Sequence, residues 1–464
     1  MKSLFSFLLL LLAAAVQAAS STGSRLLVIL NDVADKEKYS TFLGDLTSRG
    51  FDIEYETPKS ESLTLFHLGE RTYDHVLVLP TKIKGLGPNL TPNKFVDFMN
   101  ANGNIMVALS SDNVASSSIT ALLTELDISL PADRTGLVVD HFNYDVSSAA
   151  DKHDTLLVSP PKPLKAGVKG YFTPEGDSAE PVVFPHGVGH LLGQGHLLNP
   201  VLKAPDTAYS YNPQEQADGV DPADLFAAGS QLGLVSTFQA RNSARFTLVG
   251  SADMLTDKWF DAKVKPADGG KAVGTWNREF AKRISGWTFQ EIGVVRVNWI
   301  EHHLNEAGEP SESNPHIYRV NNNVTFTISL SEYTWNTWVP YQPPAQDAIQ
   351  LEFAMLSAFH RLDLTPVEVT PNAAAYSASF TIPSQHGIFN FLVNYKRPFV
   401  TSIDEKVTVT VRHLAHNEFT RSYDIVAAWP WIGGIVSTIV GFLAFSAVFM
   451  YSKPTNLVES KKKQ

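Results

Sequence analysis

The segment that decides the fold of the N-terminal half is Arg25–Asp32, RLLVILND. It holds an uninterrupted apolar run from Leu26 to Leu30, which stops at the polar pair Asn31-Asp32. Short apolar runs of this kind are typical of strands that are buried on both faces of a sheet. The segment therefore predicts an interior strand that leads directly into a loop.

The residues that follow alternate between helical and extended patterns. Segment 37–51 has apolar residues at helical spacing and closes on a glycine, which is common just after a helix. Tyr73–Pro80 is a second buried run, and Thr91-Pro92 is the start of a helix that leads into a strand at Ile105–Leu109. Strands separated by helices predict a mostly parallel, doubly wound sheet.

The two halves of the chain differ in pattern. After residue 140 the alternation gives way to Gly- and Pro-rich sequence, and a strand followed by a helix returns only at Ala244–Phe260. We therefore assign residues 19–265 to an α/β domain and interpret residues 264–275 as a linker. From Trp287 onward, β-branched and aromatic residues alternate between turn signals, which predicts an all-β region of one or two sandwich-like units over residues 285–425.

The two ends of the chain carry membrane and targeting signals. Residues 1–18 combine an early lysine, a short apolar run and small residues before the expected cleavage after Ala18, as in a secretory signal peptide; the alternative is an uncleaved anchor helix. Residues 429–451 hold no charged side chain and are long enough to span a bilayer, with tryptophans and a tyrosine at the ends. A buried core helix is the alternative, but core helices seldom stay uncharged over such a length.

Together these signals predict a single-pass type I membrane protein with its bulk in the lumen. The tail, residues 452–464, is then cytosolic, and its lysines agree with the positive-inside bias. Within the span, Gly433, Ser437 and Gly441 recur at intervals of four and form a stripe of small residues on which a neighbouring helix can pack.

Composition limits the function classes. The formal net charge of −10 offers no basic surface for nucleic acid, and the absence of cysteine removes thiol catalysis and Cys-based metal sites. No serine-nucleophile elbow, HExxH, P-loop or GxGxxG motif occurs, so we expect neither catalytic residues nor a cofactor.

Two histidine clusters are candidates for metal sites. His186, His190 and His196 lie among glycines that disfavour a helix, so we interpret this segment as a loop with packed or solvated histidines and expect no metal. Glu301, His302 and His303 lie on an expected strand, where adjacent side chains point to opposite faces; a shared site is therefore not expected.

Two glycosylation sequons are present. Asn323-Val324-Thr325 is a candidate N-glycosylation site, whereas Asn89-Leu90-Thr91 is followed by Pro92, which weakens it.

Several blocks resemble one known family. They occur in family order along nearly the whole chain, and the most specific are WTFQEIGVVRVNWIEHHL, IQLEFAMLS, FNFLVNYKRPF and AAWPWIGGIVSTIVGFLAFSAVFMYSKP. With the type I topology and the lysine tail, the chain is identified as a member of the 48-kDa (Wbp1-like) subunit family of the eukaryotic oligosaccharyltransferase.

The resemblance implies a function that composition alone does not. It implies a non-catalytic subunit, with a Rossmann-like, glutamine-amidotransferase-like lumenal domain, in the complex of the endoplasmic reticulum that transfers a preassembled oligosaccharide from dolichol pyrophosphate to asparagine in N-x-S/T sequons. The catalytic residues of that complex lie on a separate multi-span subunit, so none is carried over to this chain. A type I cargo or quality-control receptor and a membrane-anchored hydrolase remain as alternatives.

If the tail is cytosolic, the C-terminal lysines can act as a targeting signal. Lys461 and Lys462 occupy the fourth and third positions from the C-terminus. They resemble the dilysine signal by which coat proteins retrieve type I proteins to the endoplasmic reticulum, a receptor-read address. The alternative is an ordinary solvated terminus.

Overall fold

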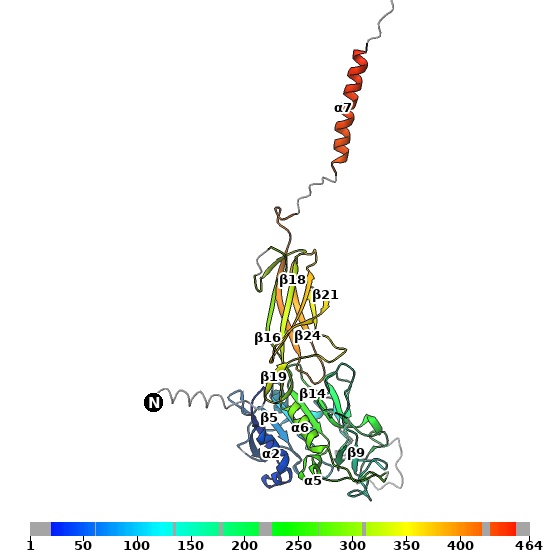
Figure 1. Ribbon diagram of the computed structural model, residues 1–464. Helices are drawn as coiled ribbons and strands as arrows, with labels where there is room; N and C mark the ends of the chain where they lie inside the picture. Colours follow the sequence, from blue (N-terminus) through cyan, green and yellow to red (C-terminus); the bar gives the residue numbers. More distant parts are fainter. Residues whose placement is uncertain are drawn as a thin grey trace, which may run out of the picture. The chain divides into compact units, whose positions relative to one another are not determined.

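The computed structural model describes residues 20–60, 62–132, 136–174, 176, 180–212, 225–267, 269–308, 312–419 and 427–451. Contacts along the chain divide it into two units, residues 1–411 and 412–464, and each is described by itself. Figure 1 gives the labels of the main helices and strands.

The first domain is built on a seven-stranded sheet. Its order is β12 (Leu198–Lys203), β14 (Gly233–Gln239), β15 (Arg245–Val249), β6 (Asn104–Ala108), β5 (His75–Val78), β1 (Arg25–Ile29) and β2 (Asp52–Glu56). The five strands from β15 to β2 pair in parallel, whereas β14 and β12 are antiparallel additions at one edge. The predicted interior strand is confirmed, because β1 lies between β5 and β2 and its residues Leu26–Ile29 are fully buried.

Helices cover both faces of this sheet, as the alternating pattern predicts. The helices are α2 (Ser40–Ser48), α3 (Pro92–Asn100), α4 (Ser117–Glu125), α5 (Asp257–Phe260) and α6 (Asn277–Thr288), with 3₁₀ turns η1 (Val33–Tyr39), η2 (Gly229–Gln231) and η3 (Asp253–Leu255). Alternate residues of β1 separate the two cores: Leu26 packs in the same cluster as α2 and α6, and Leu27 packs with α3 and α4. The predicted cap of α3 is confirmed, because Thr91 accepts a hydrogen bond from the Lys94 amide and Pro92 opens the helix.

Helix α6 was not predicted. The sequence suggested that the α/β domain ends near residue 265, yet α6 packs into the core of that domain through Phe280 and Ile284. The Asn277 side chain anchors its first turn by bonding the backbone of Val183 in both directions. Part of the expected linker is also tied down, because Val264 and Val273 pair as an isolated bridge.

Four two-stranded ribbons complete the first domain. They are β3 (Phe66–His67) with β4 (Glu70–Arg71), β7 (Ile128–Ser129) with β11 (Leu191–Leu192), β8 (Leu137–Val139) with β13 (Tyr209–Tyr211), and β9 (Thr155–Val158) with β10 (Val182–Pro185). Three of these ribbons, built from strands between Ile128 and Tyr211, occupy the stretch in which the sequence pattern loosens.

The second domain is one antiparallel sandwich. One sheet has the order β16 (Ile292–Leu304), β18 (Asn323–Thr334), β23 (Ala374–Thr381), β22 (Thr365–Val369), with β19 (Thr337–Pro340) also on β18. The other has the order β17 (Ile317–Arg319), β25 (Ile403–Arg412), β24 (Gly387–Tyr395), β20 (Gln350–Ala354), β21 (Ala358–Asp363). Aromatic rings from both sheets meet between them: Phe326 stacks on Phe391 with ring centres 5.3 Å apart.

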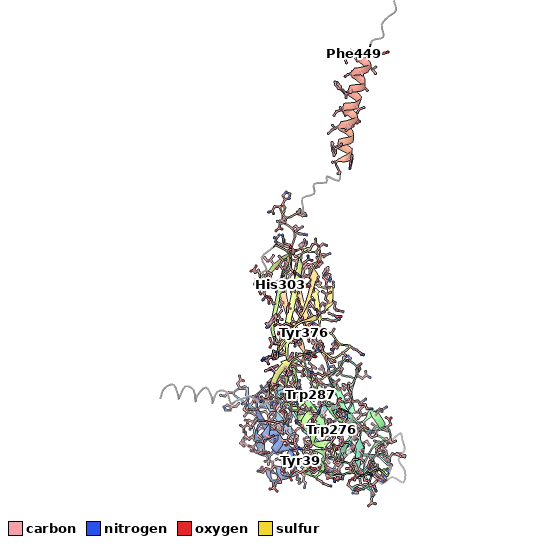
Figure 2. The ribbon with its side chains drawn as sticks, in the orientation of Figure 1. Tyr39, Trp276, Trp287, His303, Tyr376 and Phe449 are labelled. Carbon is pink, nitrogen blue, oxygen red and sulfur yellow. The ribbon has the colours of Figure 1, made fainter. Side chains whose placement is uncertain are left out.

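The junction of these two domains is buried and polar. Arg245 at the start of β15 donates hydrogen bonds to the carbonyls of Trp287, Ile292 and Gly293. The Trp287 indole nitrogen donates to the Phe399 carbonyl at 2.8 Å, and Gln239 donates to the Val400 carbonyl at 2.8 Å. The last turn of α6 therefore contacts the sandwich directly. Figure 2 labels Trp287, which belongs to this turn.

The second unit contains helix α7 (Trp429–Met450), which has 22 residues, a mean hydropathy of 2.1 over an 18-residue stretch and no buried residue. Among the described residues it is the one helix long and apolar enough to cross a membrane. Because its side chains have no protein cover, its apolar surface suits lipid or other membrane helices better than a soluble core.

Candidate functional site at the strand ends

A polar cavity of about 910 Å³ opens beside the carboxyl ends of β6 and β15. Its lining includes Ser111 and Asp112 after β6, Asp154 before β9, His186 after β10, and Tyr211 at the end of β13. The carboxyl ends of parallel strands are the usual place for ligands in α/β sheets, because loops from neighbouring strands meet there.

His186 is held in this cavity by three loops. Its backbone oxygen accepts hydrogen bonds from the amide and the hydroxyl of Ser111, at 3.1 and 2.8 Å, and its amide donates to the Asp154 carbonyl at 3.0 Å. Its φ of 43° lies in the left-handed region, which non-glycine residues seldom adopt. A strained backbone conformation of this kind persists only where the surrounding contacts hold the residue in place.

The imidazole of His186 lies between two carboxylates. Nδ1 is 3.1 Å from an Asp253 oxygen, and Nε2 is 3.7 Å from an Asp154 oxygen. The hydrogen bond to Asp253 raises the pKa of His186, burial works against that rise, and the Asp154 charge adds to it. The ring is therefore protonated at a higher pH than a free histidine.

The arrangement around His186 is suited to binding polar groups. The Ser111 hydroxyl donates to the His186 carbonyl and not to the ring, so these two residues do not form the Ser–His contact of a hydrolase. Carboxylates and a histidine around an open cavity are instead partners for hydroxyl or amide groups of a ligand.

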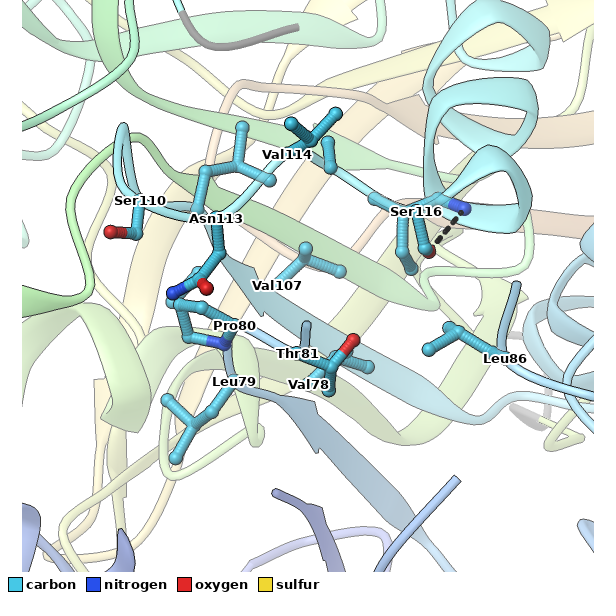
Figure 3. A pocket seen from close by; sticks show the side chains of 14 residues that line it. Val78, Leu79, Pro80, Thr81, Leu86, Val107, Ser110, Asn113, Val114 and Ser116 are labelled. Carbon is cyan, nitrogen blue, oxygen red and sulfur yellow. Dashed lines mark hydrogen bonds between the residues drawn. The ribbon is translucent and has the colours of Figure 1, made fainter. Parts of the chain in front are cut away.

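A second, much smaller cavity lies at the ends of β5 and β6. Figure 3 shows its lining, which includes Leu79, Thr81 and Val107, with Ser116 hydrogen-bonded to the first turn of α4. Its volume of about 20 Å³ holds roughly one water molecule. It therefore offers no room for a nucleotide or another cofactor.

The structure separates the three histidines of the glycine-rich loop. His190 is fully buried and its Nε2 lies 2.6 Å from the Ser236 hydroxyl, whereas His196 is exposed and lines another cavity. His302 is buried beside the Tyr318 hydroxyl, and neighbouring Glu301 accepts a bond from Ser313. Within the part of the chain that the structure describes, no group of three or more His, Cys, Asp or Glu is placed to hold a metal ion.

The sequence did not predict a third cluster of polar side chains, which contains two histidines and a tyrosine. His141 Nδ1 lies 2.5 Å from His153 Nδ1, and His141 Nε2 lies 2.9 Å from the Tyr209 hydroxyl. No spacing rule joins these residues, because they come from the loop 140–154 and from β13, which only the fold brings together.

The remaining predicted residues are placed as follows. Asn323 begins β18 and is exposed, with its side-chain oxygen accepting a bond from Thr381 at 2.6 Å. Gly433, Ser437 and Gly441 lie in α7, where a side chain added at either glycine meets no other atom of the described chain within 4 Å. Residues 1–18 and the pair Lys461-Lys462 lie outside the described residues.

Comparisons with known proteins agree on one family. Residues 17–291 match the model described as "OST48, N-terminal domain", and residues 302–453 match "OST48 middle domain". Similarity to solved structures is weak: a putative ThuA-like protein from Parabacteroides merdae is 12% identical, covering 57% of this chain and 88% of its own, with a TM-score of 0.27. Likeness at that level carries no argument about the fold.

Curated relatives match over nearly full length. The dolichyl-diphosphooligosaccharide–protein glycosyltransferase subunit wbp1 of Schizosaccharomyces pombe is 34% identical over 92% of both chains. The 48 kDa subunit of the same enzyme is 30% identical in Arabidopsis thaliana, over 93% of this chain and 94% of that one. In Danio rerio it is 31% identical over 92% of both. The chain therefore belongs to the OST48 family, the family of the 48 kDa subunit of dolichyl-diphosphooligosaccharide–protein glycosyltransferase.

Proposed function

We propose that this chain is a non-catalytic subunit of the oligosaccharyltransferase complex of the endoplasmic reticulum, which transfers a preassembled oligosaccharide from dolichol pyrophosphate to asparagine in N-x-S/T sequons. The observation that carries the proposal is the match along 92% of both chains to a protein named as a subunit of this enzyme. The names of the relatives, which are those of a subunit, support an accessory role. The alternative of a cargo receptor has no comparable support.

Co-purification tests this role directly. The tagged full-length chain, extracted in mild detergent, should recover a fixed set of membrane subunits, including a multi-span catalytic subunit, and depletion of the chain should lower occupancy of reporter sequons. Recovery of varying soluble glycoproteins alone, with unchanged sequon occupancy, would contradict the proposal and favour a receptor.

The α/β domain is, in this proposal, a Rossmann-like domain of the glutamine-amidotransferase type. The supporting observation is the order of its parallel strands: counted along the chain they run 2-1-3-4-5 across the sheet, which is an order found in doubly wound nucleotide-binding folds. Helices on both faces are consistent with it.

The topology proposed is single-pass type I. A cleaved signal peptide, residues 1–18, would place the two domains in the lumen, and α7 would anchor them. The tail 452–464 would then be cytosolic, where coat proteins could read Lys461 and Lys462 as a retrieval signal.

The small-residue stripe of α7 is proposed to pack against spans of partner subunits. Gly433, Ser437 and Gly441 are all exposed and lie at intervals of four, which lets a second helix approach closely. Replacing both glycines by isoleucine should reduce recovery of partner subunits without preventing membrane insertion. The control is Ser446→Ile, which enlarges a small residue on the opposite side of α7, since successive residues turn by about 100° around a helix; equal losses in both variants would remove the stripe from the proposal.

The loops around His186 are proposed to guide the acceptor chain or the glycan. Asp112, Asp154 and Tyr211 face the cavity and can bind hydroxyl or amide groups. Asp151 is a further carboxylate in the cavity lining, and replacing Asp112 and Asp151 by asparagine should lower occupancy of test sequons in an intact complex. Unchanged occupancy with both replaced would contradict the guiding role but not the membership of the complex.

A further inference from the structure

A third cavity, of about 680 Å³, lies where the α/β domain meets the sandwich. The α/β domain contributes His196, Asn199 and Arg241, and the turn between β24 and β25 contributes Lys396 and Ser402. Its size is in the range of small-molecule sites, which occur preferentially between domains. It is separate from the strand-end cavity, with which it shares no lining residue.

The cavity lining carries a net positive charge, whereas the chain as a whole is negatively charged. The protein carries a formal −10, but Arg241, Lys396 and Arg397 line the cavity against a single carboxylate, Asp404. A cavity lined by one sign of charge concentrates ligands of the opposite sign. The cavity therefore favours an anion.

Two of the three cations are available to a ligand. Arg397 is committed, since its Nε and Nη2 atoms bond Asp347 at 2.6 to 3.0 Å. Lys396 is paired only with Asp404 at 3.1 Å, and both side chains are more than half exposed, at 54% and 62%, so the pair exchanges readily. Arg241 is exposed and has no hydrogen bond or ion pair to any residue that the structure describes.

The same cavity holds unmet hydrogen-bonding groups. Gln239 is only 8% exposed; its amide nitrogen donates to the Val400 carbonyl, but its Oε1 lacks a donor among the described residues. The side chains of Asn199 and Ser402 also line the cavity and bond no other described side chain. Asn199 and Ser402 therefore offer an amide and a hydroxyl to a ligand, whereas the Gln239 Oε1 atom is buried out of its reach.

We propose that this cavity binds a phosphorylated sugar. The phosphate lies between Arg241 and Lys396, because guanidinium and ammonium groups are the standard partners of phosphate oxygens. The sugar hydroxyls bond Asn199 and Ser402, whose amide and hydroxyl groups both donate and accept. This inference goes beyond the proposed role in the complex and does not depend on it.

Calorimetric titration of the full-length chain in detergent micelles tests the proposal. The probes are glucose 1-phosphate, glucose and inorganic phosphate, each added at the same ionic strength. Saturable binding of glucose 1-phosphate is expected, with glucose and inorganic phosphate each at least about tenfold weaker, since each loses one set of contacts. No saturable binding of glucose 1-phosphate, or equal binding of inorganic phosphate alone, would overturn it.

Variants test the phosphate-binding residues and the sugar-binding residues separately. Arg241→Ala should weaken glucose 1-phosphate about tenfold or more, the loss expected for one charge-assisted contact. Ser402→Ala combined with Asn199→Ala should reduce the difference between glucose 1-phosphate and inorganic phosphate. Arg361→Ala, an exposed arginine on β21 outside the cavity, is the matched control and should leave binding unchanged. Equal weakening by Arg241→Ala and Arg361→Ala would reduce the binding to non-specific charge attraction and reject the site.

Discussion

The guanidinium carbon of Arg245 lies 4.7 Å from the centre of the Trp287 ring, and both side chains are at most 1% exposed. Arg245 belongs to the central sheet and Trp287 to the last turn of α6, immediately before the first strand of the sandwich. A cation stacked on an aromatic face in a dry site contributes about 2 kcal/mol or more. The contact therefore holds α6, the helix that leads into the sandwich, against the central sheet through one buried charge.

Replacing Arg245 by methionine should destabilise the chain strongly. Three backbone carbonyls would lose their donors, and we expect a loss of about 3–5 kcal/mol in the free energy of unfolding. Burial lowers the pKa of Arg245 to about 9, still above neutral pH, so the native side chain stays charged. Urea unfolding followed by tryptophan fluorescence measures the loss; Arg361→Met, on the surface, should change it by less than about 0.5 kcal/mol.

Glu291 should make stability depend on pH. Burial raises its pKa from 4.5 to about 7, and the nearby Arg49, whose Nη1 lies 2.6 Å away, only partly offsets that rise. Because the folded-state pKa lies above the unfolded value, this stabilisation is complete below about pH 4.5 and is lost as pH rises through about 7.

The test compares the native chain with Glu291→Gln at pH 5 and pH 7.5. Between these values the native chain should lose up to about 3 kcal/mol more than the variant does, since one unit of pKa shift corresponds to roughly 1.4 kcal/mol. Parallel pH profiles for the two proteins would show that Arg49 keeps Glu291 ionised throughout.

His186 should titrate at a lower pH when its main partner is removed. Asp253→Asn removes the charge that accepts the Nδ1 hydrogen bond, so the pKa of His186 should fall. Histidine-selective NMR of the full-length chain in micelles measures it. Asp112→Asn is the control, because Asp112 contributes least of the neighbouring carboxylates and should produce a smaller fall; the reverse ranking would contradict the assignment.

Asn323 should carry a glycan and Asn89 should not. Asn323 is exposed at the start of β18, whereas Asn89 is half-buried and its sequon threonine, Thr91, caps α3. Removing glycans with endoglycosidase should shift the native chain and Asn89→Gln on a gel, but not Asn323→Gln. A shift that persists in Asn323→Gln would place the glycan elsewhere.

The C-terminal lysines should retain a reporter. Changing Lys461 and Lys462 to serine in a reporter that carries residues 427–464 should release it to the cell surface, where antibody labelling of unpermeabilised cells detects it. The control is a reporter with Lys453 and Lys463 changed to serine, which should stay inside. Continued retention of the double variant at 461 and 462 would show that the pair is dispensable.

The sequence predicted those elements whose burial leaves a local pattern. The runs at β1 and β5 and the capped start of α3 were found because each carries its own apolar or capping signal. Helix α6 was missed because it is rich in polar residues and follows a stretch of glycines, so its burial depends on the sheet above it. The cavity around His186 could not be predicted either, since Asp154, His186 and Asp253 come from separate segments that only the fold brings together.

The position of the Arg245 contacts has a practical consequence for dissecting the protein. The two family matches suggest a cut near residue 291, between the α/β and middle domains. A fragment ending there would keep the Trp287 carbonyl but lose those of Ile292 and Gly293, and it would also lose Phe399, which accepts the indole bond. Expression of the N-terminal piece alone should therefore leave Trp287 more exposed and Arg245 with one of its three carbonyl partners. Fragments that run through residue 412 keep both domains whole, whereas a cut at the boundary between the two family matches divides them.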